Sequence, residues 1–415
     1  MFEIKNRDIA GRIGILKISN KKIETPLLLP VINPKKQEIY PKEMQDKYKV
    51  NAIMTNAYII YSDKKLRETL LEINLNKYFD FSGIIETDSG AYQILHYKKD
   101  IDISNKEIVK FQIEIGSNII NVLDLPTDID KSWEEAKKEL EITINRIREG
   151  IEIRDSLNKN VLINGAIQGG VYLDLRKQAA IEISNLGVDI YAIGTIVPYM
   201  IKYDFYKLFE TIIVPRILLP LDKPVHLFGL GHPLTIPLSI AIGCDIFDSA
   251  SYALYANDNR IMTHYGTFRL DELEDFYLET KNKCYHISEI KEMQKEEKTK
   301  IIAEHNLFVL LKEISIVKDS IKNQYLFDII LFKAHYHKSL YKATKYILEN
   351  FYNWLKRLDP IRKRSGIVYD GDLLEIRTDV KRAIERLNER VDPRDFEDIY
   401  KYVFPFNSIK NDKIL

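Results

Sequence analysis

Three aspartates each follow a short apolar run, a position from which a carboxylate can do chemistry. They are Asp88 in IIETDSG, Asp124 in NVLDLPT and Asp248 in CDIFDSASY. A carboxylate buried among apolar residues is costly without a partner, so three of them favour ion pairing or catalysis. For any one alone, a hydrogen-bonded helix N-cap explains the position equally well. Two carboxylates that flank a sugar carbon would permit substitution at a glycosidic bond through a covalent intermediate.

Several glycines and one amide residue, Gln168, also lie at or just after the ends of apolar runs. Small residues let a ligand approach the backbone closely and leave N–H groups free to bind it. A planar heterocycle fits such a slot, with Tyr92 available to stack on it and Gln168 available to read its edge. The glycines are Gly90, Gly169, Gly170, Gly194, Gly229 and Gly231.

Eight apolar runs rich in Val, Ile and Leu predict strands that are buried on both faces, as in a parallel sheet covered by helices. Eight strands alternating with helices over about 260 residues predict a (β/α)8 barrel, an α/β fold whose active site lies at the C-terminal strand ends. A doubly wound open sheet is the rival, but no dinucleotide glycine fingerprint follows the first strand. The predicted strands are 27–32, 52–58, 84–89, 120–125, 162–168, 190–195, 225–231 and 246–251.

Two intervening helices have clear boundary signals. Ser132 followed by Glu135 forms a capping-box signature that predicts a helix over about 132–155. A second helix is predicted over about 172–186, ending at Gly187.

The remainder of the chain is charged and helix-forming. We expect the barrel over 1–267, a helical extension that closes it over 268–345, and an α-rich C-terminal appendage over 346–415. A basic run in the appendage is a candidate phosphate contact, although a solvated helix end explains it as well. That run comprises Lys356, Arg357, Arg362, Lys363 and Arg364.

Composition narrows the class of protein. The 415 residues are 45% hydrophobic and 29% charged, enough for a packed core, and the 61 basic and 61 acidic residues cancel, so nucleic-acid binding would have to be local. Two cysteines, Cys244 and Cys284, do not make a disulfide scaffold. With neither a signal peptide nor an apolar run long enough to span a membrane, a cytoplasmic protein is expected.

Seven ordered motifs carry a resemblance to a known family. TDSGAYQ (87–93), FQIEIG (111–116), LDLPT (123–127), IQGG (167–170), YAIGTIVP (191–198), HLFGLGHP (226–233) and GCDIFDSASYALYANDNRIMT (243–263) closely resemble the archaeal tRNA-guanine transglycosylases. The resemblance covers about residues 10–310, and more loosely the stretch to about 380.

The resemblance implies a (β/α)8 barrel that exchanges an encoded guanine in tRNA for a deazaguanine. Asp248 would attack the anomeric carbon, and Asp88 would donate and accept protons. Asp124 and Gln168 would bind the base edge, helped by the backbone of Gly169 and Gly194, and Tyr92 would stack on the ring. The archaeal members insert 7-cyano-7-deazaguanine at position fifteen of the D-loop, toward archaeosine, and are often homodimers.

Departures from the family pattern concern zinc and length. The family carries a Cys-x-Cys-x-x-Cys cluster and a downstream His, of which this chain keeps Cys284 and His305, too few for a structural zinc. His286 or Glu279 could supplement these two ligands. The favoured expectation is no metal site, with Cys284 as a small buried side chain and His305 packed in the core. The chain is also too short for the family's C-terminal PUA module, so a separate PUA-domain protein is a possible partner.

Two other functions remain open. A non-catalytic or RNA-docking subunit of a heteromeric transglycosylase would tend to lose its nucleophile, yet Asp88, Asp124 and Asp248 are all present. A relative that inserts a deazaguanine into DNA is the second alternative, and whether the bound substrate is RNA or DNA would distinguish it. The catalytic assignment is therefore Asp88 and Asp248, with tRNA and guanine or 7-cyano-7-deazaguanine as substrates.

Overall fold

A closed barrel of eight parallel strands forms the centre of the molecule. The computed structural model describes residues 2–91, 103–157, 160–367 and 371–390. Hydrogen bonds between β11 and β4 close the barrel, which confirms the predicted fold and all eight predicted strands. The strands are β4 (Leu27–Ile32), β5 (Ala52–Asn56), β6 (Ile84–Asp88), β7 (Ile119–Asn121), β8 (Leu162–Ile167), β9 (Ile190–Ile193), β10 (Val225–Leu227) and β11 (Ile246–Ser249).

A three-stranded antiparallel sheet precedes the barrel and was not predicted from the sequence. It comprises β1 (Phe2–Asp8), β2 (Gly11–Ile18) and β3 (Lys21–Thr25). Leu16, Ile18 and Ile23 of this sheet share one buried apolar cluster with residues at the N-terminal starts of the barrel strands, such as Ile84 and Ile190. The sheet therefore covers the N-terminal end of the barrel, and the C-terminal end remains for the active site.

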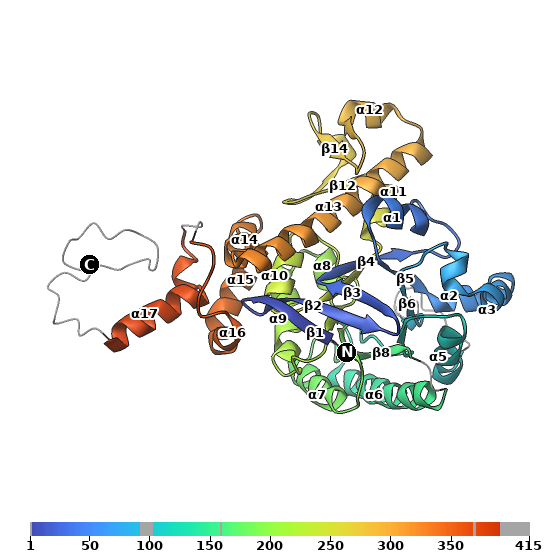
Figure 1. Cartoon of the computed structure of the whole chain (residues 1–415), viewed down its shortest axis with the longest axis horizontal. Helices are drawn as coiled ribbons and strands as arrows, with labels where there is room; N and C mark the ends of the chain where they lie inside the picture. Colours follow the sequence, from blue (N-terminus) through green and yellow to red (C-terminus); the bar gives the residue numbers. More distant parts are fainter. Residues whose placement is uncertain (1, 92–102, 158–159, 368–370, 391–415) are drawn as a thin grey trace.

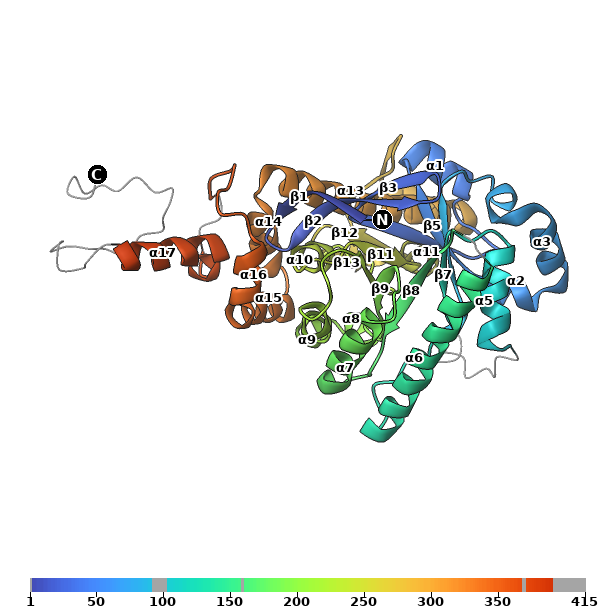
Figure 2. The same ribbon diagram turned by 60° about the horizontal axis from the view of Figure 1, so that its bottom comes forward.

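Helices surround the barrel in an outer ring (Figure 1). The predicted capping box is present, with the Ser132 hydroxyl accepting from the Glu135 N–H, and it begins the long helix α6 (Trp133–Ser156). This helix lies along the lower edge of the molecule in Figure 1 and slants down to the bottom of the view in Figure 2. Helix α7 (Leu173–Ser184) ends before Gly187, whose φ of +79° belongs to the following turn. The other ring helices are α1 (Pro41–Tyr48), α2 (Ala57–Ser62), α3 (Lys64–Tyr78), α5 (Asn105–Glu114), α8 (Val197–Ile201), α9 (Phe205–Arg216), α10 (Ile236–Ala241) and α11 (Ser251–Asn257).

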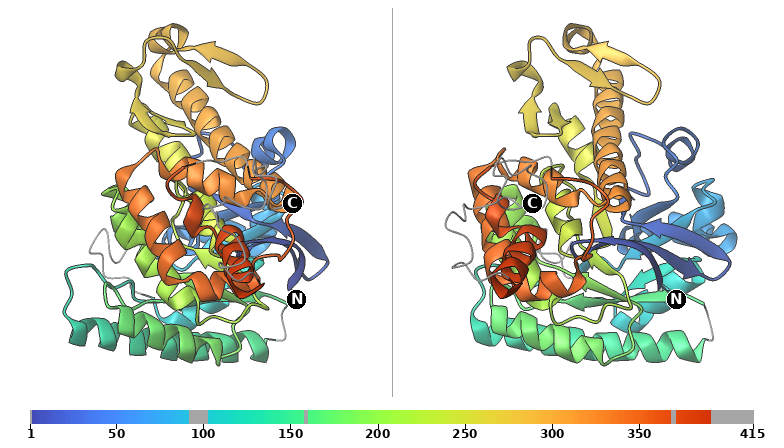
Figure 3. Two further views of the ribbon diagram at one scale, coloured as in Figure 1. Left: turned by 90° about the vertical axis from the view of Figure 1, so that its left-hand side faces the viewer. Right: turned by 60° about the vertical axis from the view of Figure 1, so that its left-hand side comes forward.

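Two hairpins and a long helix follow the barrel. The hairpins and the short helix α12 project from one side, and α13 runs from them back along the barrel (Figure 3). This segment is therefore not wholly helical, and the barrel is closed by its own strands. The elements are β12 (Arg260–Thr263), β13 (Gly266–Arg269), β14 (Tyr277–Glu279), β15 (Cys284–His286), α12 (Ile287–Glu292) and α13 (Lys295–Asn323).

Further helices form the C-terminal part of the described chain, on the left of Figure 1. They are α14 (Leu326–Ala334), α15 (Lys338–Asn350), α16 (Tyr352–Leu358) and α17 (Thr378–Arg390), with a short 3-10 helix at Leu374–Ile376. Another 3-10 helix, Leu270–Glu272, lies between β13 and β14. The division into three domains at residues 267 and 345 stays a prediction. Among the described residues, no helix combines the length and apolar character needed to cross a bilayer.

Candidate active site

The barrel brings the predicted carboxylates to one end. Asp88 is the last residue of β6, Asp248 lies in β11 one residue before its end, and Asp124 follows β7 by three residues. The charges of Asp124 and Asp248 both act on Asp88, which places the three side chains within electrostatic range of one another. The C-terminal ends of parallel strands meet at one mouth, so residues far apart in sequence share a site.

The Asp248 carboxylate is held through one of its oxygens. Its Oδ1 accepts from Nε2 of His226 at 3.0 Å and from the backbone N–H of Gly229 at 2.9 Å. Both donors come from β10 and the loop after it, next to β11 in the barrel. The side chain is therefore fixed in orientation while Asp248 as a whole is 7% exposed.

Asp88 lies where its proton is easily gained or lost near neutral pH. Burial and the charge of Asp124 raise its pKa to about 7, against the backbone hydrogen bond at Gly90. Nδ2 of Asn56 donates to Asp88 Oδ2 at 2.6 Å. A carboxyl group with such a pKa can serve as both acid and base at neutral pH.

Asp124 and Gln168 form one polar unit. Nε2 of Gln168 donates to Asp124 Oδ2 at 2.5 Å, and Oε1 of the same amide accepts from the Thr195 hydroxyl at 2.7 Å. Burial raises the pKa of Asp124 to about 6, in spite of the hydrogen bond from Gln168. The pair presents a carboxylate and an amide side by side, a combination suited to the edge of a purine.

The two predicted site glycines are both needed for space. A Cβ on Gly194 would lie 2.6 Å from Nε2 of Gln168, so only glycine leaves that amide in place. Gly169 has a φ of +128°, and a Cβ there would meet the backbone N of Arg176 at 2.9 Å. Buried Arg176 joins the two loops, donating through Nε to the Gly170 carbonyl at 2.7 Å and through its Nη atoms to the Gly194 carbonyl at 3.2 Å. Whether the backbone of Gly169 or Gly194 also binds a base stays a prediction.

Tyr92, predicted to stack on the base, lies outside the described residues. Its stacking role stays a prediction.

Sequence reasoning missed the residues that support the carboxylates. Asn56, Glu86 and His226 were not selected, although each is polar within an apolar strand run. Glu86 is two residues from Asp88 on the same strand, and strand alternation places such residues on one face. That periodicity was the available signal for a second inward-facing carboxylate.

The residues left from the family's zinc cluster do not form a metal site. Nδ1 of His305 accepts from the Glu279 N–H at 2.9 Å, and Nε2 donates to the Met262 carbonyl at 2.9 Å. His305 is 3% exposed, which confirms its expected packing, but Cys284 is exposed on β15, so its expected burial was wrong. No group of three His, Cys, Asp or Glu side chains suited to a metal occurs within the described ranges. Both ring nitrogens are used by the backbone, so these residues do not fit zinc.

Part of the predicted basic run forms ion pairs within the protein. Nζ of Lys363 contacts the carboxylates of Asp8 and Asp359, and its side chain is 5% exposed. Lys356 pairs with Glu385. The inclusion of Lys363 in a phosphate-binding surface was therefore wrong, because a buried ammonium with two carboxylate partners is not available to RNA.

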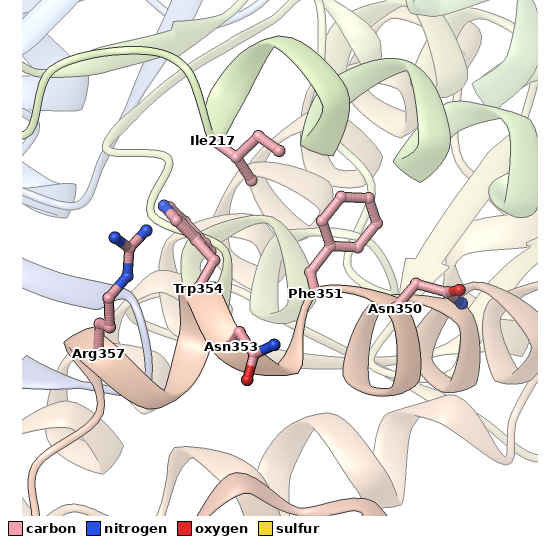
Figure 4. A pocket seen from close by; sticks show the side chains of 6 residues that line it. All are labelled: Ile217, Asn350, Phe351, Asn353, Trp354 and Arg357. Carbon is pink, nitrogen blue, oxygen red and sulfur yellow. The ribbon is translucent and has the colours of Figure 1, made fainter.

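A cavity elsewhere on the molecule is unrelated to this mouth. Figure 4 shows it between the end of α9 and helices α15 and α16. The connection from α9 to β10 lies at the N-terminal end of the strands, opposite the carboxylates. Its lining residues are Ile217, Asn350, Phe351, Asn353, Trp354 and Arg357.

The closed barrel and the carboxylates at its C-terminal mouth define an α/β-barrel enzyme. The family model described as "Queuine tRNA-ribosyltransferase" matches residues 8–338. The chain belongs to this family, which confirms the family resemblance of the sequence motifs.

Three similar proteins from archaea share one name. A tRNA-guanine(15) transglycosylase of Nanoarchaeum equitans is 51% identical over 410 residues, 99% of this chain and 95% of that protein. Proteins of the same name from Pyrococcus furiosus and Methanocaldococcus jannaschii are 45% and 40% identical, over 88% and 93% of this chain. The chain spans 61% and 59% of those two relatives.

Proposed function

We propose that the chain is a tRNA-guanine(15) transglycosylase, which exchanges guanine in the tRNA D-loop for 7-cyano-7-deazaguanine by double displacement. One observation carries the proposal: a rigidly held Asp248 and an Asp88 with a pKa near 7 share one barrel mouth with the Asp124–Gln168 pair. A nucleophile, an acid/base and a reader of the base edge are the groups that this exchange needs.

In the first step, a carboxylate oxygen of Asp248 attacks C1′ of the target nucleoside. The new oxygen–carbon bond forms as the C1′–N9 bond breaks, and the bonding electron pair leaves with guanine. Protonated Asp88 donates a proton to the departing base and becomes a carboxylate. The tRNA is then held on Asp248 as an ester while its phosphodiester chain stays intact.

In the second step, the Asp88 carboxylate takes a proton from the incoming base, whose nitrogen attacks C1′. The C1′–oxygen bond to Asp248 breaks and its electron pair returns to the carboxylate. Both catalytic groups recover their starting states. This cycle requires Asp88 to exchange a proton readily, which a pKa of about 7 permits at neutral pH.

The base would be recognised by Asp124 and Gln168, with Tyr92 stacking on its ring. Guanine and 7-cyano-7-deazaguanine present the same pyrimidine edge of donors and acceptors, so one carboxylate–amide pair can bind either. A free guanine that rejoins the tRNA is then a convenient labelled substrate.

Binding of the whole tRNA is part of the same proposal. The net charge of zero limits phosphate contacts to local groups, so a separate PUA-domain protein would raise affinity through a second attachment point. Assembly as a homodimer is also proposed. Titration of tRNA with and without a PUA-bearing partner, and the solution mass of the chain, test these two points.

The catalytic proposal is tested by incubating the full chain with unmodified tRNA and labelled guanine. Wild type should exchange guanine and, with a poor incoming base, form a protein–RNA adduct on a denaturing gel. Asp248→Ala should do neither, and Asp88→Asn should lower turnover about 10²–10⁴-fold while tRNA binding survives.

Asp258→Asn is a matched control, because that side chain is 65% exposed beyond α11. It should exchange like wild type. Formation of an adduct by Asp248→Ala would refute the assignment of Asp248 as the nucleophile. Unchanged turnover of Asp88→Asn with weakened tRNA binding would refute the acid/base role of Asp88. Exchange of guanine in duplex DNA but not in tRNA would refute the proposal that tRNA is the substrate.

A further inference from the structure

The proposed nucleophile is the first of three buried side chains that contact one another in a row, Asp248, His226 and Glu86. His226 of β10 lies between two carboxylates, with Nε2 3.0 Å from Asp248 Oδ1 and Nδ1 3.5 Å from Glu86 Oε1. The side chains of His226 and Glu86 have no exposed surface. The three residues come from strands β10, β11 and β6, so barrel closure alone assembles them.

Two amide side chains hold Glu86, the last side chain of this row. Oε1 of Glu86 accepts from Nδ2 of Asn121 at 3.0 Å and from Nδ2 of Asn164 at 2.7 Å. These two donors fix the direction of the Glu86 carboxyl group. Glu86 therefore faces the imidazole as a buried, hydrogen-bonded group, and not as a solvent-exposed acid.

The imidazole is charged in this setting. Burial by itself lowers the pKa of His226, but the charge of Glu86 and the hydrogen bond to Asp248 outweigh that effect and raise it to about 9. Glu86 and Asp248 are the charged groups that act on the ring, and the ring of Phe228 packs beside it at 4.8 Å between centroids. At neutral pH, His226 is then an imidazolium between two carboxylates.

The same contacts distinguish the two oxygens of Asp248. Oδ1 already accepts two hydrogen bonds, from His226 and Gly229. An oxygen with two donors is a poorer nucleophile than its neighbour, so Oδ2 is the atom available to attack C1′.

We propose that His226 is a positioning residue that, as an imidazolium held by Glu86, aims Oδ2 of Asp248 at C1′ and makes Asp248 a competent leaving group in the second displacement. The inference rests on the proposed function, since it assumes an Asp248 ester. When the C1′–Oδ2 bond breaks, the electron pair returns to the carboxylate, and the developing charge on Oδ1 meets the His226 and Gly229 donors. His226 keeps its proton throughout.

This arrangement suits an exchange reaction. A cation bonded to a carboxylate lowers its nucleophilicity, yet stabilises it as it departs. Loss of the charge should therefore slow the breakdown of the ester more than its formation. The adduct should then accumulate.

The test compares His226→Gln with wild type, using unmodified tRNA and labelled guanine. Glutamine can still donate to Asp248 but carries no charge. We expect kcat to fall about tenfold, KM for tRNA to stay within about twofold, and the steady-state fraction of adduct to rise. In single-turnover breakdown of the preformed adduct, a step in which Asp88 is already ionised, the wild-type rate should decline above pH about 9, where His226 loses its proton, and His226→Gln should lack that decline.

Glu86→Gln provides an independent variant with a readout that a structural role would not move. Without the Glu86 charge, His226 should lose its proton at lower pH, so the alkaline decline should move downward. His232→Gln is the matched control, because His232 is a buried histidine on the loop after β10 that makes no ion pair within the described part of the chain. It should keep the wild-type decline.

The outcomes separate the two proposals. Absence of exchange and adduct in wild type would refute the proposed function itself. Exchange by wild type, with an unchanged alkaline decline and adduct fraction in His226→Gln, would overturn the role of His226. If His226→Gln does not fold by circular dichroism, Glu86→Gln decides: a downward shift supports the inference, and an unmoved decline overturns it.

Discussion

Asn56 and Asp88 are register partners on the adjacent strands β5 and β6, and the amide of Asn56 links the proposed catalytic acid, Asp88, to the start of a helix. Nδ2 of Asn56 lies 2.6 Å from Asp88 Oδ2, while its Oδ1 accepts from the Ile59 N–H as the N-cap of α2. The cap fixes which end of the amide faces the carboxylate. Asn56 thus favours ionised Asp88, opposing the burial that favours the neutral acid.

Asn56→Asp should raise the pKa of Asp88 above about 7. Aspartate preserves the cap but replaces the donor with a like charge. Adduct formation needs the protonated acid, so in wild type its rate should fall as pH rises through about 7. In the variant, that midpoint should move to higher pH in single-turnover measurements. A midpoint at the wild-type pH would show that Asn56 does not act on Asp88.

Gly194→Ala should weaken binding of the free base without affecting the nucleophile. The new Cβ would meet Nε2 of Gln168 at 2.6 Å and force the amide away from Asp124. Losing a hydrogen bond to a charged group costs about 1.5–3 kcal/mol, so KM for guanine should rise about tenfold or more. Gly366→Ala, where a Cβ meets nothing within 4 Å, is the control. Equal KM values in the two variants would contradict the arrangement.

Lys363→Met should destabilise the fold. Its ammonium is buried against Asp8 and Asp359, and its removal leaves both carboxylates without that cation, at a cost of about 3–5 kcal/mol. Urea unfolding measures the change. The exposed neighbour Arg362 offers a control, since Arg362→Gln should alter stability by less than about 0.5 kcal/mol. Equal stabilities would mean that Lys363 is not part of the packed structure.

Chelation should leave the fold intact. Both His305 nitrogens bond to backbone groups and Cys284 is exposed, so packing around α13 holds this region without a metal. Thermal unfolding before and after dialysis against EDTA should coincide, and Cys284→Ser should unfold like wild type. One zinc per chain by elemental analysis, lost together with thermal stability, would restore Cys284 and His305 as ligands.

The sequence by itself determined the barrel strands and the helix after β7. Each strand is a short apolar run whose residues are buried on both faces, and the capping box at Ser132 is a local hydrogen-bond pattern. The three aspartates could be selected for a similar reason, because a carboxylate at the end of an apolar run is a local signal. The N-terminal sheet was missed, since its strands β1 and β3 alternate with exposed charged residues and are stabilised by covering the barrel.

Only the tertiary structure decided what each charged group contacts. Glu86, His226 and Asp248 are separated by up to 162 positions along the chain, and Lys363 meets Asp8 from the opposite end of the sequence. Ion pairs and hydrogen bonds of this kind depend on barrel closure and strand register, which local patterns do not specify. The basic run therefore looked exposed in sequence, although folding buries Lys363 between two acids, where its charge stabilises the fold and is unavailable to RNA.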